Sequence, residues 1–200
     1  MKDTLFRERM AKNVLVVYGS RYGCTEEVSK EIVKVLEKEG LEVSLVNLES
    51  TKDAPDVKNF DAVLVGSGIK IGKWTKGTDN FLKKNKTQLK DKTLGLYTCS
   101  GLAMEDAEKA KKMYVEEKME DLGIDAQLFD VFPGKSILSD FDLSNPNIGF
   151  IERKIIEQAA KAQAKDNKPI KIDEKWKNDP KGWEEIKSFA SKFAKMVKSK

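Results

Sequence analysis

The 200-residue sequence contains no histidine, only two cysteines and no long hydrophobic run. The absence of histidine excludes imidazole metal sites, Ser–His and Cys–His catalysis, and the usual proton shuttle near neutral pH. Two cysteines, Cys24 and Cys99, are too few for a disulfide scaffold or a four-thiolate metal site. No segment approaches the ~20 apolar residues of a membrane span, and the start lacks the apolar core of a signal peptide. We therefore expect a cytoplasmic protein without an integral membrane segment.

The composition indicates a folded domain. With 40% hydrophobic residues, a chain of this length can bury a core, and its charges are nearly balanced, with 37 basic and 33 acidic residues. Six Lys and two Glu in residues 181–200 account for the net charge of +4, so the rest of the chain is neutral. This distribution argues against a broadly basic protein that coats nucleic acid, and we expect no nucleic-acid partner.

Strand and helix patterns alternate along most of the chain. Apolar runs predict strands at 13–18, 41–48, 60–65, 93–98 and 124–132. Helical spacing of apolar residues predicts helices at 25–39, 79–89, 104–122, 148–164 and 181–198. Thr25 is the predicted N-cap of the first helix. Such alternation predicts an α/β fold with a five-stranded parallel sheet and right-handed crossovers.

The pattern changes at the two ends of this region. Residues 1–12 are expected to form an N-terminal extension, before a single domain over 13–200. The polar segment 135–147 predicts an inserted loop, and 165–180 a charged linker. The apolar stripe of the last helix, 181–198, should cover the sheet, although a basic amphipathic helix that lies on a membrane surface is the alternative.

Three of the predicted strands end in loops of glycine and hydroxyl residues. In parallel α/β sheets, ligands bind at the carboxyl ends of the strands, near the point where the strand order reverses. The loops at these ends are Gly19–Thr25, Gly66–Trp74 and Thr98–Gly101, and none contains an acidic residue. Uncovered backbone N–H groups at a helix N-terminus favour an anion, so the first loop predicts a phosphate site. A plain strand-to-helix turn with a capping Thr is the alternative.

Several nucleotide and regulatory motifs are missing. The first loop has neither the Gly-Lys-Thr/Ser ending of a Walker A loop nor Gly-x-Gly-x-x-Gly, which disfavours nucleoside triphosphates and the standard NAD mode. A response-regulator receiver needs acidic side chains where this chain has Tyr18-Gly19-Ser20 and Gly66-Ser67, so that function is excluded.

The loop sequences resemble the flavodoxin superfamily. Its phosphate loop reads Ser/Thr-x-Thr-Gly-x-Thr, and residues 20–25, Ser-Arg-Tyr-Gly-Cys-Thr, match it except that Tyr22 replaces the central Thr. Residues 65–72 and the Trp-Glu helix at 182–190 are similar to the flavodoxin-domain branch that includes the menaquinone-dependent protoporphyrinogen oxidases. The resemblance covers residues 13–197 and implies a flavodoxin-like three-layer sandwich with strand order 2-1-3-4-5.

The resemblance implies FMN as the cofactor. Its phosphate would lie on residues 20–25, and its isoalloxazine between the 66–74 and 98–104 loops, with the backbone of 66–69 near the N5 edge. Ile69 and Trp74 are candidates to pack against the ring; alternatively, Trp74 is a surface aromatic that covers the next helix. We predict no catalytic side chain and no metal ligand. The candidate cofactor-binding residues are Ser20, Arg21, Tyr22, Gly23, Cys24, Thr25, Gly66, Ser67, Gly68, Ile69, Lys70, Ile71, Gly72, Trp74, Thr98, Cys99, Ser100 and Gly101.

Both cysteines and three lysines lie on or beside these loops. Cys24 and Cys99 could be redox-active or contact the flavin, although packing as small residues is the commoner role. Because the expected strand order separates their strands, we expect no disulfide between them. Lys70, Lys73 and Lys76 are either ordinary solvated lysines or a site that recruits an acidic donor protein or an anionic small molecule.

These features leave three functions. An FMN-dependent electron carrier between redox protein partners, such as an acidic ferredoxin, needs no acid–base side chain and is favoured. An oxidase of the protoporphyrinogen type would pass electrons from a tetrapyrrole to a quinone; the closing helix supports it, but Asp140 and Asp142 make the insertion acidic and unsuited to porphyrin propionates. A cofactor-free interaction module would require all three loops to be accidental.

Overall fold

The computed structural model describes residues 11–20, 23–51, 54–70, 72–134 and 180–200. Its parallel strands are β1 (Asn13–Gly19), β2 (Glu42–Asn47), β3 (Ala62–Lys70), β5 (Thr93–Ser100) and β6 (Leu128–Pro133). They are ordered β2-β1-β3-β5-β6, and the two-residue strand β4 (Lys73–Trp74) pairs antiparallel with β3. The predicted strand order 2-1-3-4-5 is therefore confirmed, with β5 and β6 as its fourth and fifth strands.

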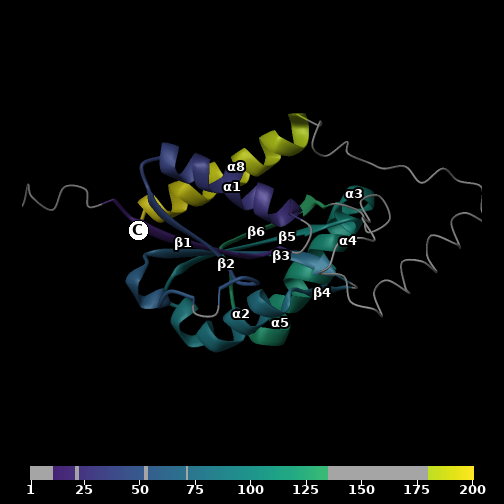
Figure 1. Ribbon diagram of the computed structural model, residues 1–200, viewed down its shortest axis with the longest axis horizontal. Coiled ribbons are helices and arrows are strands. Elements are labelled where there is room, and N and C mark those ends of the chain that lie inside the picture. The colour runs from purple at the N-terminus through teal and green to yellow at the C-terminus, as the bar shows by residue number, and fades with distance from the viewer. Residues whose placement is uncertain (1–10, 21–22, 52–53, 71, 135–179) are drawn as a thin grey trace, which may run out of the picture.

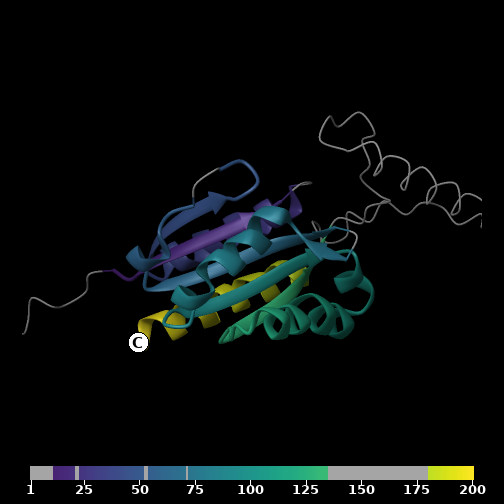
Figure 2. The same ribbon diagram turned by 90° about the horizontal axis from the view of Figure 1, so that it is seen from below.

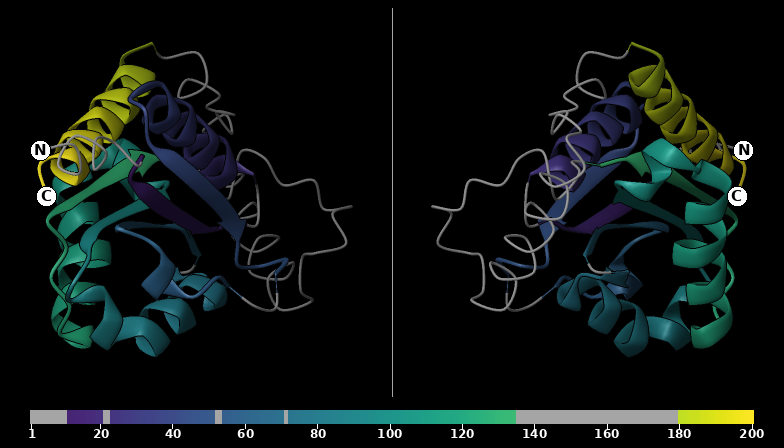
Figure 3. Two further views of the ribbon diagram at one scale, coloured as in Figure 1. Left: turned by 90° about the vertical axis from the view of Figure 1, so that its left-hand side faces the viewer. Right: turned by 90° about the vertical axis from the view of Figure 1, so that its right-hand side faces the viewer.

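Helices cover both faces of the sheet and make three layers (Figure 1). On one face lie α1 (Cys24–Lys38) and α8 (Pro180–Lys198), side by side in all the views (Figures 2 and 3). The opposite face carries α2 (Lys76–Leu89) and a second helical stretch. That stretch follows the short helix α3 (Leu102–Glu105) and consists of α4 (Ala107–Lys111), the π-helical segment η2 (Lys112–Glu116) and α5 (Glu117–Leu122). One 3-10 turn, η1 (Val57–Asn59), precedes β3.

The central strands are apolar on both sides because each side meets a helical layer. Val14 and Val16 belong to the core under α1 and α8, whereas Leu15 and Val17 belong to the core under α2. Tyr97, Phe132 and Phe189 form an aromatic cluster in the first core, with ring centroids 5.5–6.1 Å apart.

The last helix packs on the sheet as predicted. Ile186, Phe189, Phe193 and Val197 are at most 2% exposed and belong to the same core as α1. The apolar stripe that a membrane surface would bind is buried inside the protein. The interfacial-helix alternative is therefore wrong for this folded state.

The predicted helix 104–122 is wrong as a single element. Asp106 has an extended backbone, with φ −152° and ψ 92°, and this ends α3 at Glu105. The Asp106 side chain then accepts a hydrogen bond from the Lys109 N–H and caps α4. Asp is a strong N-cap residue, so it starts a new helix here rather than continuing the old one.

Other element boundaries differ by a few residues. Helix α2 begins at Lys76 instead of Asp79, and β6 begins at Leu128 instead of Ile124. Strand β3 continues through the predicted 66–74 loop as far as Lys70 and turns back into β4. The predicted loop 135–147 and helix 148–164 lie outside the described residues, as do most of the extension 1–12 and nearly all of the linker 165–180.

Candidate functional site

The three glycine-rich loops lie at one edge of the sheet. Gly19 of β1 is in register with Ser67 of β3, and Ser67 is in register with Thr98 of β5. The strands are parallel, so their carboxyl ends are level and point the same way. Figure 1 shows β4 and α3 at this same end of the molecule. The structure therefore brings the first, second and third predicted loops together.

The first loop leads into the N-terminus of α1. Gly23 is the N-cap, in the left-handed region with φ 85°, and its N–H donates to Ser20 Oγ at 3.1 Å. The prediction that Thr25 is the N-cap is wrong, because Thr25 is the second residue of the helix and only 2% exposed. A glycine N-cap has no side chain to satisfy the first-turn N–H groups, so these stay open to an anion. Arg21 and Tyr22 lie outside the described residues.

The first loop packs directly against the second at Gly68. A Cβ on Gly68 would lie 3.0 Å from Thr25 Oγ1, which is too close for an ordinary contact. Thr25 also acts on the Cys99 thiol, where hydrogen bonding with its side chain partly offsets the raised pKa. The helix N-terminus, the end of β3 and the end of β5 therefore meet around one buried hydroxyl group.

The two cysteines are neighbours although they form no disulfide. Cys24, the first residue of α1, donates from Sγ to Pro133 O at 3.6 Å. A hydrogen bond with Cys24 and burial together raise the pKa of the Cys99 thiol. The expectation of no disulfide rested on strand order, and that premise was incomplete. Strand order separates β1 from β5, whereas the start of α1 reaches across to Cys99.

Buried hydroxyl groups hold the second loop. Ser67 Oγ accepts hydrogen bonds from Thr75 N at 3.0 Å and from Thr78 Oγ1 at 3.0 Å. Thr75 Oγ1 lies where a Cβ on Gly19 would be, only 1.8 Å from that position, so the end of β1 requires glycine. These contacts join the end of β3 to the start of α2. The β3–β4 hairpin is thereby anchored on both sides.

Trp74 is a core residue that anchors the same hairpin. It is 8% exposed, and its Nε1–H donates to Tyr114 O at 2.6 Å. Tyr114 lies in the π-helical segment η2. A π-helical turn changes the i-to-i−4 hydrogen bonding of an α-helix, so a backbone carbonyl there can accept a hydrogen bond from a side chain outside the helix. These contacts favour the alternative in which Trp74 packs against a helix, in the core rather than at the surface. A contact with the flavin ring stays a prediction for Trp74 and for the half-buried Ile69.

The third loop contains one buried hydroxyl without a partner. Ser100 Oγ accepts from the Ala103 N–H at 3.2 Å, and Ser100 O accepts from the Gly134 N–H at 2.9 Å. Thr98 is fully buried, yet its Oγ1 has no hydrogen-bond partner among the described residues. A buried hydroxyl without a partner costs free energy, so this position would gain from a ligand or water. Gly101, the N-cap of α3, ends this loop.

The rim of the second loop is basic and open. Lys73 and Lys76 are exposed, while the side chains of Lys70 and Ile71 lie outside the described residues. Gly72 has φ 69°, with nothing within 4 Å of a built Cβ. The rim can therefore meet a partner without rearrangement of the hairpin.

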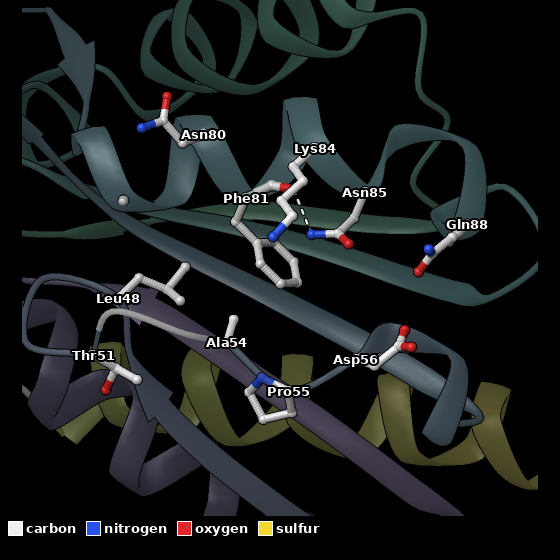
Figure 4. A pocket seen from close by; sticks show the side chains of 11 residues that line it. Leu48, Thr51, Ala54, Pro55, Asp56, Asn80, Phe81, Lys84, Asn85 and Gln88 are labelled. Atoms are coloured by element: carbon white, nitrogen blue, oxygen red, sulfur yellow. Dashed lines mark hydrogen bonds between the residues drawn. The ribbon is translucent and has the colours of Figure 1, made fainter.

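A separate cavity of about 510 Å³ lies along α2 and was not predicted from the sequence. Figure 4 shows Phe81, Lys84 and Gln88 from α2 facing Ala54 and Pro55 of the β2–β3 connection. In the described part of that connection the only helical element is the three-residue 3-10 turn η1, so no α-helix of this connection covers α2. None of the predicted site residues lines this cavity.

Metal and membrane sites were also sought in the described part of the chain. In those ranges, no three His, Cys, Asp or Glu residues are grouped so that they could hold a metal ion. No helix within the same ranges combines the length and apolar character needed to cross a bilayer.

Comparison with known proteins places the chain in a family. The model of the flavodoxin domain family matches residues 15–169. The quinone-dependent protoporphyrinogen IX dehydrogenase of Escherichia coli (strain K12) is 25% identical over 89 residues, which are 44% of this chain and 49% of that protein. This chain thus spans about half the length of the curated relatives it matches.

Two solved flavodoxin structures are similar to this chain. A flavodoxin from the domain Archaea aligns with a TM-score of 0.54 at 16% identity, covering 93% of this chain and 99% of that one. The two-electron reduced flavodoxin of Megasphaera elsdenii aligns with a TM-score of 0.47 at 23% identity, covering 74% and 98%. The resemblance noted from the loops is confirmed, and the archaeal match supports the flavodoxin-like sandwich.

Proposed function

We propose that this chain, which belongs to the flavodoxin domain family, is an FMN-binding redox protein that carries electrons between protein partners. Family membership implies FMN as the cofactor. The observation that carries the proposal is the glycine-capped N-terminus of α1, which opens at the edge where the three loops meet. A cytoplasmic setting stays a prediction.

The described residues fit FMN at this edge. A phosphate dianion is stabilised by the open N–H groups and the positive end of the dipole of the 15-residue helix α1. Gly23 leaves open space for close approach of the phosphate, and Ser20 folds the loop around that space. The partnerless Thr98 hydroxyl offers one more polar group beneath the site. The described loop residues are not acidic, while Glu26 and Glu27 in the first turn of α1 offset part of the attraction of the helix dipole for the phosphate.

In this proposal the protein binds and orients the cofactor. Ser20, Gly23 and Thr25 would hold the phosphate, while the β3–β4 hairpin and the Thr98–Gly101 loop would flank the ring. FMN, when bound, supplies one- and two-electron redox chemistry. The Ser67–Thr75–Thr78 hydrogen bonds keep the hairpin in place and exclude water from its base.

The electron-carrier role is favoured by what the loops contain. Their described residues include no carboxylate and, since the chain has no histidine, no imidazole, so they lack the side chains that most often act as general acid or base. An electron carrier needs neither group. Lys73 and Lys76 are exposed beside the site and would steer an acidic partner such as a ferredoxin.

The second candidate is an FMN-dependent oxidoreductase acting on protoporphyrinogen or a quinone. The 25% identity to the quinone-dependent protoporphyrinogen IX dehydrogenase favours it. That similarity covers 49% of the relative, so the substrate of the whole relative does not follow for this chain.

A reconstitution and electron-transfer experiment tests the proposal. The full chain is loaded with FMN, and its flavin absorbance is followed anaerobically after mixing with a reduced acidic ferredoxin at low and high salt. We expect rapid bleaching that slows at high salt, since exposed charges are screened. The double change Lys73→Gln with Lys76→Gln should slow it further, whereas Lys84→Gln, at an exposed lysine on α2 away from the loops, should not.

Two results would count against the carrier role. A protein that binds no FMN removes the whole proposal. Turnover of protoporphyrinogen with a quinone, combined with no reduction by ferredoxin, would instead establish the oxidoreductase.

A further inference from the structure

We propose that Cys24 and Cys99 form a dithiol site that hydroperoxides oxidise to a disulfide, and that this oxidation and FMN binding exclude one another. The first part needs only the two thiols. The second part rests on the proposed function.

The two cysteines meet although 74 positions separate them in the sequence. The Cys24 thiol donates to Pro133 O at 3.6 Å, and the residue before Pro133, Phe132, is the register partner of Cys99. Both cysteines belong to the same buried cluster, and Cys24 is the first cause of the raised pKa of the Cys99 thiol. Their sulfur atoms are therefore neighbours beneath the first loop.

The two thiols have different surroundings. Cys24 is the first residue of α1, where the helix dipole and open N–H groups stabilise a thiolate. Cys99 lies in the strand below, away from the helix end, and both side chains are buried, with exposed fractions of 5% for Cys24 and 4% for Cys99. This asymmetry makes Cys24 the attacking thiol and Cys99 the resolving thiol.

The reaction balances with a hydroperoxide as the oxidant. The Cys24 thiolate attacks the peroxide oxygen, the O–O bond breaks, and water or an alcohol leaves once protonated, which gives a sulfenic acid. The Cys99 sulfur then attacks the Cys24 sulfur, so the S–S bond forms, the S–O bond breaks and a water leaves. The two thiols lose two electrons and two protons, and the peroxide gains them.

FMN and the thiolate compete for the same helix end. The phosphate would occupy the N–H groups that stabilise the Cys24 thiolate, and a dianion beside that sulfur disfavours its ionisation. Conversely, a disulfide would tie the first turn of α1 to β5. This would move Thr25, whose hydroxyl is proposed to bind the phosphate. The mutual exclusion follows from linkage: bound FMN favours the reduced protein, and the disulfide favours the protein without FMN.

Thiol counting tests the disulfide itself. Full-length reduced apoprotein is treated with hydrogen peroxide, denatured and labelled with a maleimide, then weighed by mass spectrometry. We expect two labels before oxidation, none afterwards, two again after dithiothreitol, and a monomer on a non-reducing gel. Because the chain has only two cysteines, a monomeric disulfide can only be Cys24–Cys99.

Variants separate this chemistry from simple packing of small residues. With Cys99→Ser, Cys24 should stop at the sulfenic acid, which dimedone traps, and no monomeric disulfide can form. In Cys24→Ser, Cys99 should keep its thiol under the same treatment. Two thiols that survive peroxide in the native protein, or disulfides found only between chains, would overturn the proposal.

The FMN arm is scored separately. With saturating FMN, oxidation should slow by about tenfold or more, and the oxidised protein should bind FMN at least about tenfold more weakly than the reduced protein. The affinity of Cys24→Ser for FMN should not respond to peroxide, because this variant keeps its one thiol reduced. Equal oxidation rates with and without bound FMN would overturn the competition. Failure of the reduced protein to bind any FMN would instead overturn the proposed function and leave the thiol result standing.

Discussion

The two ends of the sheet are built from different groups. At the amino ends, side chains close the backbone: Asp61 Oδ2 accepts from the Asn13 N–H at 2.8 Å, and Gln127 Oε1 accepts from the Leu94 N–H at 2.8 Å. At the carboxyl ends, glycine and small hydroxyl residues leave the N-terminus of α1 without a side-chain cap. If the proposed function is right, the amino ends contribute stability, whereas the carboxyl ends keep hydrogen-bonding capacity for the cofactor.

The two ends of α1 give the sharpest form of this comparison. Gly23 precedes the helix with φ 85° and Gly40 follows it with φ 83°, and a Cβ at either position would meet no atom of the described residues within 4 Å, chain neighbours aside. Valine at either position should lower the free energy of unfolding by about 1–2 kcal/mol, because φ is positive.

The largest effect is expected on FMN binding. Gly23→Val should raise the FMN dissociation constant by about 100-fold, since it disturbs the N–H groups proposed for the phosphate, each worth roughly 1.5–3 kcal/mol to a charged group. Gly40→Val should leave it unchanged. Fluorescence titration and chemical denaturation of both variants measure the two effects. Equal FMN affinities would mean that the phosphate does not bind at this end of the helix.

Removing one hydrogen-bond acceptor at the amino edge of the sheet and one at the carboxyl edge should separate effects on folding stability from effects on FMN binding. Gln127→Ala leaves the buried Leu94 N–H without its partner, so the free energy of unfolding should fall by about 1–3 kcal/mol with FMN affinity intact. Ser100→Ala removes the acceptor of the Ala103 N–H and should cost about 1 kcal/mol while weakening FMN several-fold. Urea denaturation with and without FMN compares them. A Gln127→Ala protein with weakened FMN binding would break the distinction between the edges.

A smaller effect is expected where the hairpin meets the helical layer. Trp74→Phe keeps an aromatic ring but leaves Tyr114 O without the indole N–H, which should cost about 1 kcal/mol. FMN affinity should fall a few-fold because the hairpin is held less firmly. Trp183→Phe is the matched control and should not change FMN affinity, because Trp183 lies on α8, which covers the opposite face of the sheet. Thermal unfolding and titration give both quantities, and identical FMN affinities would show that this bond serves only the core.

The smallest effect concerns the ion pair between α1 and α8. Lys198 Nζ lies 2.6 Å from Glu39 Oε2 and lowers the pKa of that carboxyl below its usual value. Because the pKa of Glu39 is lower in the folded state than in the unfolded state, the ion pair stabilises the fold at pH values above the unfolded-state pKa. That stability is lost as the pH falls through the folded-state pKa. Glu39→Gln should therefore unfold slightly more easily than the parent near neutral pH, and this difference should shrink as the pH falls through the folded-state pKa of Glu39. A difference that persists in acid would mean that the carboxyl acts through something other than its charge.

Much of the fold could be predicted from patterns that are local in sequence. Runs such as Val14–Val17 are apolar at every position because both faces of the strand are covered, so they identify central strands without a structure. The carboxyl-edge location of the loops then follows from the parallel arrangement alone.

Contacts between distant elements could not be predicted in this way. The meeting of Cys24 with Cys99 depends on where α1 crosses the sheet, which strand order does not specify. The helix break at Asp106 depends on the backbone angles of that residue. The contact of Trp74 with the π-helical segment depends on a tertiary hydrogen bond to Tyr114 O. Thr25 looked like a cap because its hydroxyl suits one, but Gly23 adopts the left-handed turn that starts the helix two positions earlier.

The central claim is that the N-terminus of α1 holds the phosphate of FMN. Comparing the dissociation constants of FMN and riboflavin for the same apoprotein tests it most directly, because the two ligands differ only in the phosphate. We expect riboflavin to bind at least about 100-fold more weakly than FMN, which is the loss of roughly 3 kcal/mol of phosphate contacts. Equal affinities for the two ligands would contradict the claim.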